Sequence, residues 1–326
     1  MNILVAIYSP VAAWNIPAEH VERLRRDFPH HSFVHARAEA DVAPLIGSAD
    51  IAFLAEISPP QLEAAQALRW VHSPAAGIGG MLFQAMRDSP VVVSNSRGMS
   101  GDAIAEHVLA LTLALFRKLP LAFRSQAARR WVDDEFFAQP NRTIAGASAL
   151  IVGLGGIGAA AARRFSALGA SVTAIRRNAD RPIPEGVTEV ATPDRLLDLL
   201  PRADVVVIAA PQTASTRRMI GAPQLQAMRR DAVLINVSRG KLVDEAALAT
   251  ALASNLIGGA GLDVFEHEPL DPGSPLWALP NVIITPHISG FRADHWDAAT
   301  DLFAENLRRF DAGEPLLNVV DKNAGY

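Results

Sequence analysis

The sequence has no cysteine among its 326 residues. This absence excludes disulfide bonds, thiolate metal ligands and thiol nucleophiles, so any chemistry must use other side chains. Apolar runs of the roughly 18 residues that a membrane span requires are also missing. The first residues, Met1 to Tyr8, lack the basic segment of a secretory signal and predict a strand. We therefore expect a cytoplasmic protein that does not enter a membrane.

A surplus of positive charge is missing as well, because 30 lysines and arginines face 34 aspartates and glutamates and leave a net charge of −4. Such a balance favours neither nucleic acid nor an anionic membrane as a partner, and anionic ligands would need local sites. Hydrophobic residues are abundant and make up 50% of the chain. A chain of this length and composition predicts two domains.

Short apolar runs alternate with helix-like segments in two series, from 1 to about 95 and from 149 to 285. This alternation predicts doubly wound α/β domains with parallel sheets, and ligands at the carboxyl ends of the strands. Neither an internal repeat nor a low-complexity tract interrupts it.

Between the two series, the residues from Ala103 to Leu119 predict a long apolar helix that Pro120 ends. Because a helix that is apolar on most sides is buried, we expect it between domains or subunits. Glu106 and His107 would then either form a buried pair or take part in chemistry. The residues from Ala122 to Arg142 predict a connecting arm with solvated charges.

The second series opens with a strand from Ala149 to Val152, a turn containing Gly153, Gly155 and Gly158, and an alanine-rich helix. In such a turn the first glycine permits the backbone angles, the second admits a pyrophosphate, and the third lets the helix pack closely on the strand. The helix start offers free N–H groups to phosphate. The alternative is a turn that serves packing alone, but a second strand from Ala170 to Ile175 completes a βαβ unit and favours dinucleotide binding.

Three ionisable residues, Arg239, Glu268 and His287, follow strands of the second series. Strand ends meet at one edge of a parallel sheet, so these side chains can converge. An arginine matches the carboxylate of a 2-oxo acid, a histidine can exchange the alcohol proton, and a carboxylate on its second nitrogen fixes the tautomer. The alternative is a surface salt bridge beside a loop histidine with no chemical role.

Three segments resemble the signatures of the D-2-hydroxyacid dehydrogenase family, namely 236–240, 261–269 and 286–290. With the glycine motif, four motifs match in order, and the resemblance covers nearly the whole chain and is closest to the glyoxylate/hydroxypyruvate reductase branch. It implies a flavodoxin-like substrate domain, 1–98 and 292–326, into which a Rossmann-type cofactor domain, 99–291, is inserted. It also implies a homodimer joined largely through the cofactor domain.

The resemblance assigns roles to individual residues. Arg239 matches the residue that orients the substrate, His287 the acid/base, and Glu268 the partner of the histidine. Asp263 matches a residue near the nicotinamide. The remaining cofactor contacts it implies are Gly153, Gly155, Gly156, Ile157, Gly158, Pro211, Thr216, Val237, Ser238 and Gly290.

A loop of small residues from Ser73 to Gly80 predicts, on its own pattern, a helix start with flexible turns. The resemblance instead assigns Ala76, Gly77 and Ile78 to a backbone loop that binds the substrate carboxylate. Gly79 departs from the pattern, because many members have aspartate there, and the loop geometry can differ accordingly.

A second departure concerns the cofactor. NAD-dependent members usually place an aspartate at the end of the second cofactor-domain strand, where this chain has Arg176 and Arg177. Guanidinium groups cannot accept a bond from a ribose hydroxyl but can bind a 2′-phosphate. The sequence therefore favours NADP(H). The alternative is that both arginines are solvated at the rim and NAD(H) is also used.

The sequence predicts an oxidoreductase that reduces a small 2-oxo acid, such as glyoxylate, hydroxypyruvate or a phenylpyruvate-like acid, with no metal in its site. The alternative from another class is a dinucleotide-sensing corepressor or scaffold on the same fold. The related formate dehydrogenases are disfavoured because they have glutamine where Glu268 stands.

Overall fold

The computed structural model describes residues 1–138 and 141–325. The chain forms two compact units, Met1–Met99 with Arg292–Tyr326, and Ser100–Phe291. Within the described residues, no helix is long and apolar enough to cross a membrane.

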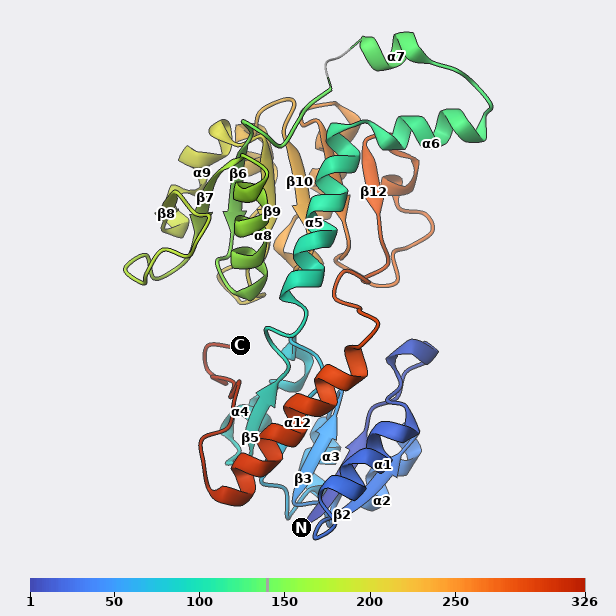
Figure 1. Ribbon diagram of the computed structural model, residues 1–326, viewed down its shortest axis with the longest axis vertical. Helices are drawn as coiled ribbons and strands as arrows, with labels where there is room; N and C mark the ends of the chain where they lie inside the picture. The colour runs from blue at the N-terminus through green and yellow to red at the C-terminus, as the bar shows by residue number, and fades with distance from the viewer. Residues whose placement is uncertain (139–140, 326) are drawn as a thin grey trace. The chain divides into compact units, whose positions relative to one another are not determined.

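The first unit contains a five-stranded parallel sheet in the order β2-β1-β3-β4-β5 (Figure 1). This is the strand order of flavodoxin-like folds. Its strands are β1 (Asn2–Ala6), β2 (Ser32–Ala36), β3 (Ile51–Leu54), β4 (Trp70–Ser73) and β5 (Val92–Asn95). Its helices are α1 (Ala18–Asp27), α2 (Glu39–Ile46), α3 (Pro59–Ala64), α4 (Gln84–Asp88) and α12 (His295–Ala312).

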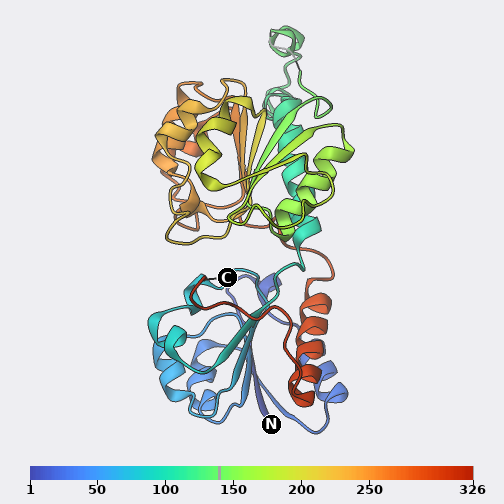
Figure 2. The same ribbon diagram turned by 90° about the vertical axis from the view of Figure 1, so that its left-hand side faces the viewer.

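Each strand of this sheet sends successive side chains to opposite faces, and both faces are covered. Along β1, Leu4 belongs to a cluster with residues of α2, whereas Ile3 and Val5 belong to a cluster with residues of α1 and α12. Phe303 of α12 stacks on Phe53, with ring centroids 4.4 Å apart. Figure 2 shows α12, in red, next to the dark-blue α1 on one face of the sheet, and the light-blue and teal helices on the opposite face. The last segment of the chain therefore completes the core that the first segment begins.

The second unit contains a seven-stranded parallel sheet in the order β12-β11-β10-β9-β6-β7-β8. Its strands are β6 (Ser148–Val152), β7 (Ser171–Ile175), β8 (Glu189–Ala191), β9 (Val205–Ile208), β10 (Val233–Asn236), β11 (Gly259–Leu262) and β12 (Val282–Ile284). Counted from β6, this is the Rossmann order with one strand added at the edge. The prediction of two parallel-sheet α/β domains is confirmed.

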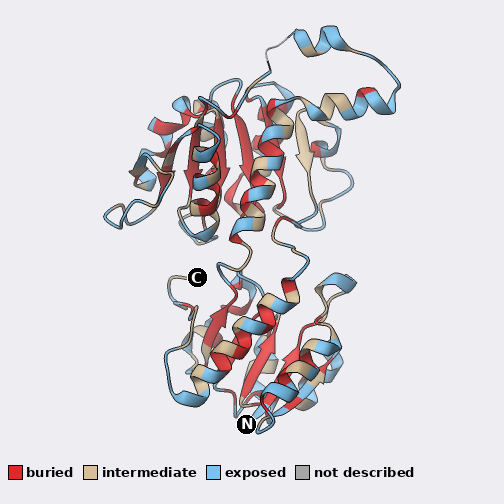
Figure 3. Ribbon diagram, in the orientation of Figure 1, coloured by how far each residue is buried: buried red, intermediate tan, exposed pale blue. Residues whose placement is uncertain are grey.

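Helices cover both faces of the second sheet. They are α5 (Gly101–Phe116), α8 (Gly156–Ala167), α9 (Leu196–Leu199), α10 (Ala222–Ala227) and α11 (Glu245–Ala253). Helices α6 (Leu119–Ala127) and α7 (Asp133–Phe137) follow α5 and extend away from the sheet (Figure 1). Residues of α5 and α8 share one apolar cluster with the strands, and residues of α9, α10 and α11 share the other. Most strands of both sheets are buried along their length, whereas β12 is only partly buried (Figure 3).

Short 3-10 helices occur in both units. They are η1 (Ala12–Trp14), η2 (Gly79–Met81), η3 (Pro193–Arg195), η4 (Leu200–Arg202), η5 (Gly240–Leu242) and η6 (Pro275–Ala278).

The predicted end of the long apolar helix was wrong. Helix α5 ends at Phe116, and Lys118 follows with a left-handed backbone, φ 57°. Pro120 instead lies in the first turn of α6. A proline fits there because the first N–H groups of a helix have no partner within the helix. The predicted arm from Ala122 to Arg142 contains most of α6 and all of α7, and two of its residues, 139 and 140, lie outside the described part of the chain.

Within this chain, Glu106 does not form the predicted buried pair with His107. Its side chain is exposed and pairs with Arg164 of α8, with an Oε1 to Nη2 distance of 3.2 Å. His107 is partly buried and contacts Thr285, with an Nε2 to Oγ1 distance of 3.0 Å. Neighbouring residues on a helix point about 100° apart, so these two side chains leave α5 in different directions.

Candidate active site

The glycine turn between β6 and α8 has backbone geometry that only glycine allows. Gly153 has φ 104°, and a Cβ there would lie 2.4 Å from the nitrogen of Ala210. A Cβ on Gly158 would lie 2.0 Å from the carbonyl oxygen of Gly153. Both distances are far below van der Waals contact, so a side chain at either position would force the turn apart.

The start of α8 faces open space. Gly155 precedes the helix, and no heavy atom lies within 4 Å of the place where its Cβ would be. Gly156 and Ile157 are the first two residues of this 12-residue helix, whose first turn has no acidic side chain. Their N–H groups and the positive end of the helix suit a phosphate group. This cradle fits the pyrophosphate of a dinucleotide.

The two arginines after β7 have different surroundings. The guanidinium of Arg176 donates hydrogen bonds to the carbonyl oxygens of Ala179 and Pro182, both at 3.2 Å, and also to that of Arg181. Arg176 therefore orders the loop that follows the strand. Arg177 is exposed.

The loops after β9 and β10 carry four further residues that the sequence assigned to the cofactor. Pro211 is exposed, and Thr216 closes its loop by donating to the carbonyl oxygen of Pro211 at 2.7 Å. Val237 is buried, and the Ser238 hydroxyl donates to the carbonyl oxygen of Ala210. Strands β6, β9 and β10 are adjacent and parallel. The loops that follow β9 and β10 therefore lie at the same carboxyl end of the sheet as the glycine turn that follows β6.

His287 and Glu268 form a close pair at the neighbouring strand ends. The His287 Nδ1 atom lies 2.6 Å from Oε2 of Glu268, and both side chains are partly exposed, at 47% and 34%. The other carboxylate oxygen accepts the N–H of Phe265 at 3.0 Å. Burial raises the pKa of Glu268, but the hydrogen bonds from His287 and Phe265 outweigh it, so this pKa lies below its ordinary value. The ring is thereby fixed with Nε2 directed away from Glu268.

The backbone of His287 is strained, with φ 54°, a region that side-chain-bearing residues rarely adopt. Asp263 compensates by holding the segment on both sides. Its carboxylate accepts the hydroxyl of Thr285 at 2.6 Å and the N–H groups of Ile288 and Ser289 at 2.9 Å each. Its carbonyl oxygen accepts the N–H of His287 at 2.9 Å.

Asp263 is fully buried, at 0% exposure. The resemblance implies a place near the nicotinamide, and in this structure its carboxylate binds the backbone on both sides of His287. Sequence reasoning missed this role, because the donors follow 22 to 26 residues later. Gly290 closes the segment, and a Cβ there would make only ordinary contacts of 3.6 Å with Ser100 and Ile104.

Arg239 follows β10 and is partly buried. Within the described residues, its guanidinium makes one hydrogen bond, from Nη1 to the carbonyl oxygen of Ser238 at 2.6 Å. Burial lowers the pKa of Arg239, and the nearby Glu268 carboxylate acts in the opposite direction. An arginine remains charged under such a shift. Because only Nη1 donates a hydrogen bond here, most of the five N–H donors of the guanidinium stay available for an anion.

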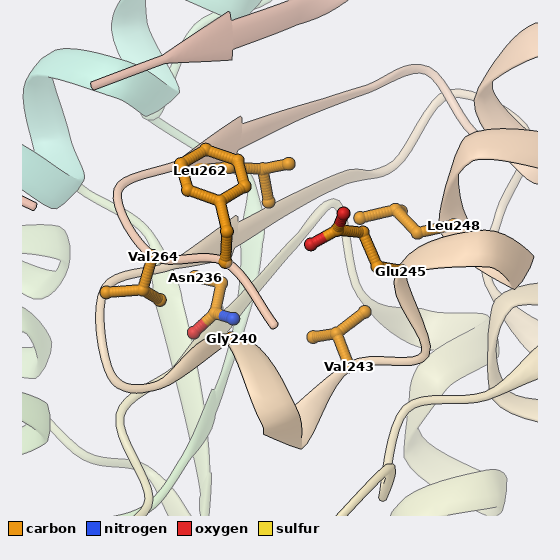
Figure 4. A pocket seen from close by; sticks show the side chains of 8 residues that line it. Asn236, Gly240, Val243, Glu245, Leu248, Leu262 and Val264 are labelled. Carbon is orange, nitrogen blue, oxygen red and sulfur yellow. The ribbon is translucent and has the colours of Figure 1, made fainter. Parts of the chain in front are cut away.

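Gly240 brings the Arg239 segment against the Glu268 segment. A Cβ on Gly240 would lie 1.8 Å from the carbonyl carbon of Phe265, so the two backbones approach as closely as glycine permits. A small cavity of about 10 Å³ lies behind this contact, and Figure 4 shows Asn236, Val264 and Glu245 around it. A cavity of this size holds about one water molecule. It therefore belongs to the support of the site, because a substrate cannot enter it.

The first unit contains the loop assigned to the substrate carboxylate. Ala76 and Gly77 are exposed and Ile78 is buried, and among the described residues no hydrogen bond involves their three N–H groups. Asn95 fixes the loop by donating from Nδ2 to the carbonyl oxygen of Ala76 at 2.6 Å. Gly79 begins η2, and a Cβ there would meet open space. An aspartate would therefore fit at this position, so the departure from the family pattern has no steric cause here.

A parallel sheet in the Rossmann order, with a glycine turn that leads into an open helix start, defines a dinucleotide-binding α/β protein. The family model for the D-isomer specific 2-hydroxyacid dehydrogenase NAD binding domain matches residues 109–289. The chain belongs to the D-isomer specific 2-hydroxyacid dehydrogenase family, and the resemblance seen in the sequence is confirmed.

Individual relatives agree with this assignment. The glycerate dehydrogenase of Methylorubrum extorquens is 33% identical, over 90% of this chain and 93% of its own. A D-isomer specific 2-hydroxyacid dehydrogenase of Xanthobacter autotrophicus, solved with NADPH and MES, is 32% identical with a TM-score of 0.84, over 100% of this chain and 99% of its own. An NADPH-dependent glyoxylate/hydroxypyruvate reductase of Sinorhizobium meliloti, solved with NADP and sulfate, is 28% identical with a TM-score of 0.85 and the same coverage. These relatives support activity on 2-hydroxy or 2-oxo acids with a nicotinamide cofactor.

Proposed function

We propose that this protein reduces a small 2-oxo acid, such as glyoxylate or hydroxypyruvate, to the 2-hydroxy acid, of D configuration where the product is chiral, with NADPH. The observation that carries the proposal is the pair formed by His287 and Glu268, with Nδ1 and Oε2 2.6 Å apart, at the strand ends of a dinucleotide-binding sheet. In this proposal the cofactor binds to 99–291, and 1–98 with 292–326 bind substrate. The cytoplasmic location remains a prediction.

The chain's own residues would act as follows. Glu268 accepts the Nδ1–H of His287 and stabilises the imidazolium form, whose Nε2–H delivers a proton to the substrate oxygen and leaves the ring neutral. Arg239 binds the carboxylate and the adjacent carbonyl oxygen through its planar guanidinium, which orients the carbonyl carbon and withdraws charge from the oxygen. The N–H groups of Ala76, Gly77 and Ile78 would bind the carboxylate. When bound, the reduced nicotinamide would supply the hydride, so that hydride and proton together convert the carbonyl group to the alcohol.

A panel of 2-oxo acids assayed with NADPH tests this function. We expect NADPH oxidation with glyoxylate, hydroxypyruvate or a larger 2-oxo acid. If no acid is reduced while NADPH still binds, the protein is a dinucleotide sensor and the enzymatic proposal is wrong.

We also propose that the cofactor is NADP(H) in preference to NAD(H). Two arginines follow β7 where an acidic residue would select NAD, and the two solved relatives above bind NADPH or NADP. The exposed Arg177 is the candidate for direct contact with a 2′-phosphate, whereas Arg176 orders the adjacent loop through three carbonyl oxygens.

This distinction gives a sharp experiment on the cofactor. Arg177→Ser should lower kcat/KM for NADPH roughly tenfold, because one charge-assisted bond is lost, and should leave NADH almost unaffected. Arg176→Ser should weaken both cofactors, because it frees the loop. If the wild type prefers NADH, or if Arg177→Ser leaves the ratio unchanged, the cofactor assignment is wrong.

Finally, we propose a homodimer formed through the second unit. Five large apolar side chains are exposed within one segment, from α5 to α7, namely Leu113, Leu119, Phe123, Trp131 and Phe137. Trp131 is 89% exposed and Phe137 is 79% exposed. Such a concentration of apolar surface is typical of a subunit interface.

A further inference from the structure

Two histidines and an aspartate come together in the first unit, away from every residue discussed above. His30 and His31 lie in the turn between α1 and β2, and Asp311 lies in the last turn of α12. The Nε2 atoms of His30 and His31 are 3.2 Å and 2.9 Å from the same Asp311 oxygen, Oδ2. One candidate ligand atom from each of the three residues lies within 4.8 Å of the other two.

The cluster is held in place but open to solvent. The His31 side chain is only 4% exposed, whereas that of His30 is 61% exposed. The Phe28 ring backs both imidazoles, with ring centroids 6.4 Å and 6.3 Å away. The backbone N–H of His31 is fixed by the carbonyl oxygen of Phe28 at 3.0 Å. An ion can therefore reach ligands that need little reorganisation.

The position of Asp311 also favours a cation. Asp311 lies at the end of α12, where the carbonyl groups give the helix a partial negative charge. An aspartate alone is unfavourable there, and a cation beside it removes the repulsion. Two positive groups act in the opposite direction, namely Arg308, whose guanidinium lies over the Phe28 ring, and the Met1 nitrogen, 3.3 Å from Nδ1 of His31.

We propose that His30, His31 and Asp311 form a binding site for a divalent transition-metal ion of the zinc type. Two imidazole nitrogens and one carboxylate oxygen are the ligands that Zn²⁺, Ni²⁺ and Co²⁺ accept, with a solvent molecule in the fourth position. Ligands about 2.0–2.1 Å from a tetrahedral ion lie roughly 3.3 Å from one another. The observed separations of 2.9–3.2 Å require only a small outward movement.

Binding through both Nε2 atoms uses ring nitrogens that carry no proton. The sequence does not reveal this site, because Asp311 lies 280 residues after His31. The three ligands come together only when α12 packs against the first unit.

The site would join the two chain segments of the first unit. An ion that binds the folded chain and not the unfolded one stabilises the fold by mass action. We expect one equivalent of Zn²⁺, added to metal-free protein without an affinity tag, to raise the melting temperature by a few degrees. Calorimetry should show one site, and Co²⁺ should give the visible absorption of a tetrahedral complex.

Variants separate this site from nonspecific binding. His30→Ala and Asp311→Asn should each abolish the zinc-dependent rise in melting temperature. The matched control is His20→Ala, because His20 also faces an aspartate of α12, Asp297 at 3.9 Å, but without a third ligand; it should keep the full rise. If zinc leaves the wild type unchanged, or if His30→Ala retains the rise, the cluster is a plain charge pair and the proposal is wrong.

Discussion

At the scale of single residues, His287 is the side chain on which turnover should depend most. His287→Ala removes the atom that delivers the proton, so we expect kcat to fall roughly 10²–10⁴-fold. The dissociation constant for NADPH, measured by fluorescence titration, should change little, because the ring faces Glu268 and not the glycine turn.

Glu268→Gln is the companion variant. It keeps an oxygen facing Nδ1 but loses the negative charge, so kcat should fall less than in His287→Ala and its pH profile should move. A defect confined to cofactor binding in either variant would contradict the assigned roles.

A second residue, His72, should make stability depend on pH. It is fully buried among aromatic rings, its Nδ1 contacts the Ser94 hydroxyl at 2.7 Å, and burial lowers its pKa from 6.5 to about 3. The unfolded chain therefore binds a proton that the folded chain does not. This stabilising contribution is complete above pH 6.5 and is lost progressively as the pH falls from 6.5 towards 3, by at most about 1.4 kcal/mol per pH unit.

Chemical denaturation at pH 7.5, 6 and 5 measures this effect. His72→Phe keeps an aromatic ring beside Phe53, at a centroid distance of 5.4 Å in the wild type, but cannot titrate. The variant should lose less stability than the wild type over this range. Parallel pH dependences would show that His72 is not responsible.

At the scale of elements, the segment after β10 packs so closely on the segment after β11 that any side chain at residue 240 should push the two apart. Gly240→Ala places a methyl group on the Phe265 backbone and separates Arg239 from Glu268. We expect a loss of about 1–3 kcal/mol of stability and a rise in KM for the 2-oxo acid. Gly221→Ala is the control, because the nearest atom to its Cβ would lie 3.7 Å away. Equal melting temperatures and KM values for the two variants would refute this account.

The elements also show what the sequence can predict. Continuous apolar runs and the glycine turn sufficed for both sheets and for the family, because parallel strands covered on both faces are apolar throughout. β8 was missed, since Glu189–Ala191 is short and begins with a charge. The hydrogen bonds of Asp263 could not be predicted either, because they depend on which buried donors the tertiary fold brings to one carboxylate.

At the scale of the whole molecule, the proposed homodimer can be tested by charge. Phe123→Glu with Trp131→Glu places two carboxylates in the exposed apolar segment and should convert the dimer to monomers in light scattering. Trp277→Glu is the control, because Trp277 is also exposed, at 53%, but lies outside the segment. A wild type that is monomeric at micromolar concentration, or a double variant that remains dimeric, would refute this interface.

The stacking of Phe303 on Phe53 has a consequence for biosynthesis. The ribosome makes β1 to β5 first but α12 only after roughly 190 further residues, which takes about 10–40 s at 5–20 residues per second. At the end of that interval 100–291 has all its own strands, whereas one face of the first sheet still has no cover from α12. We therefore expect a released chain that is truncated after residue 291 to resist protease in the second unit and to be cleaved in the first. On the ribosome, the unit that the chain begins is thus the last to be completed.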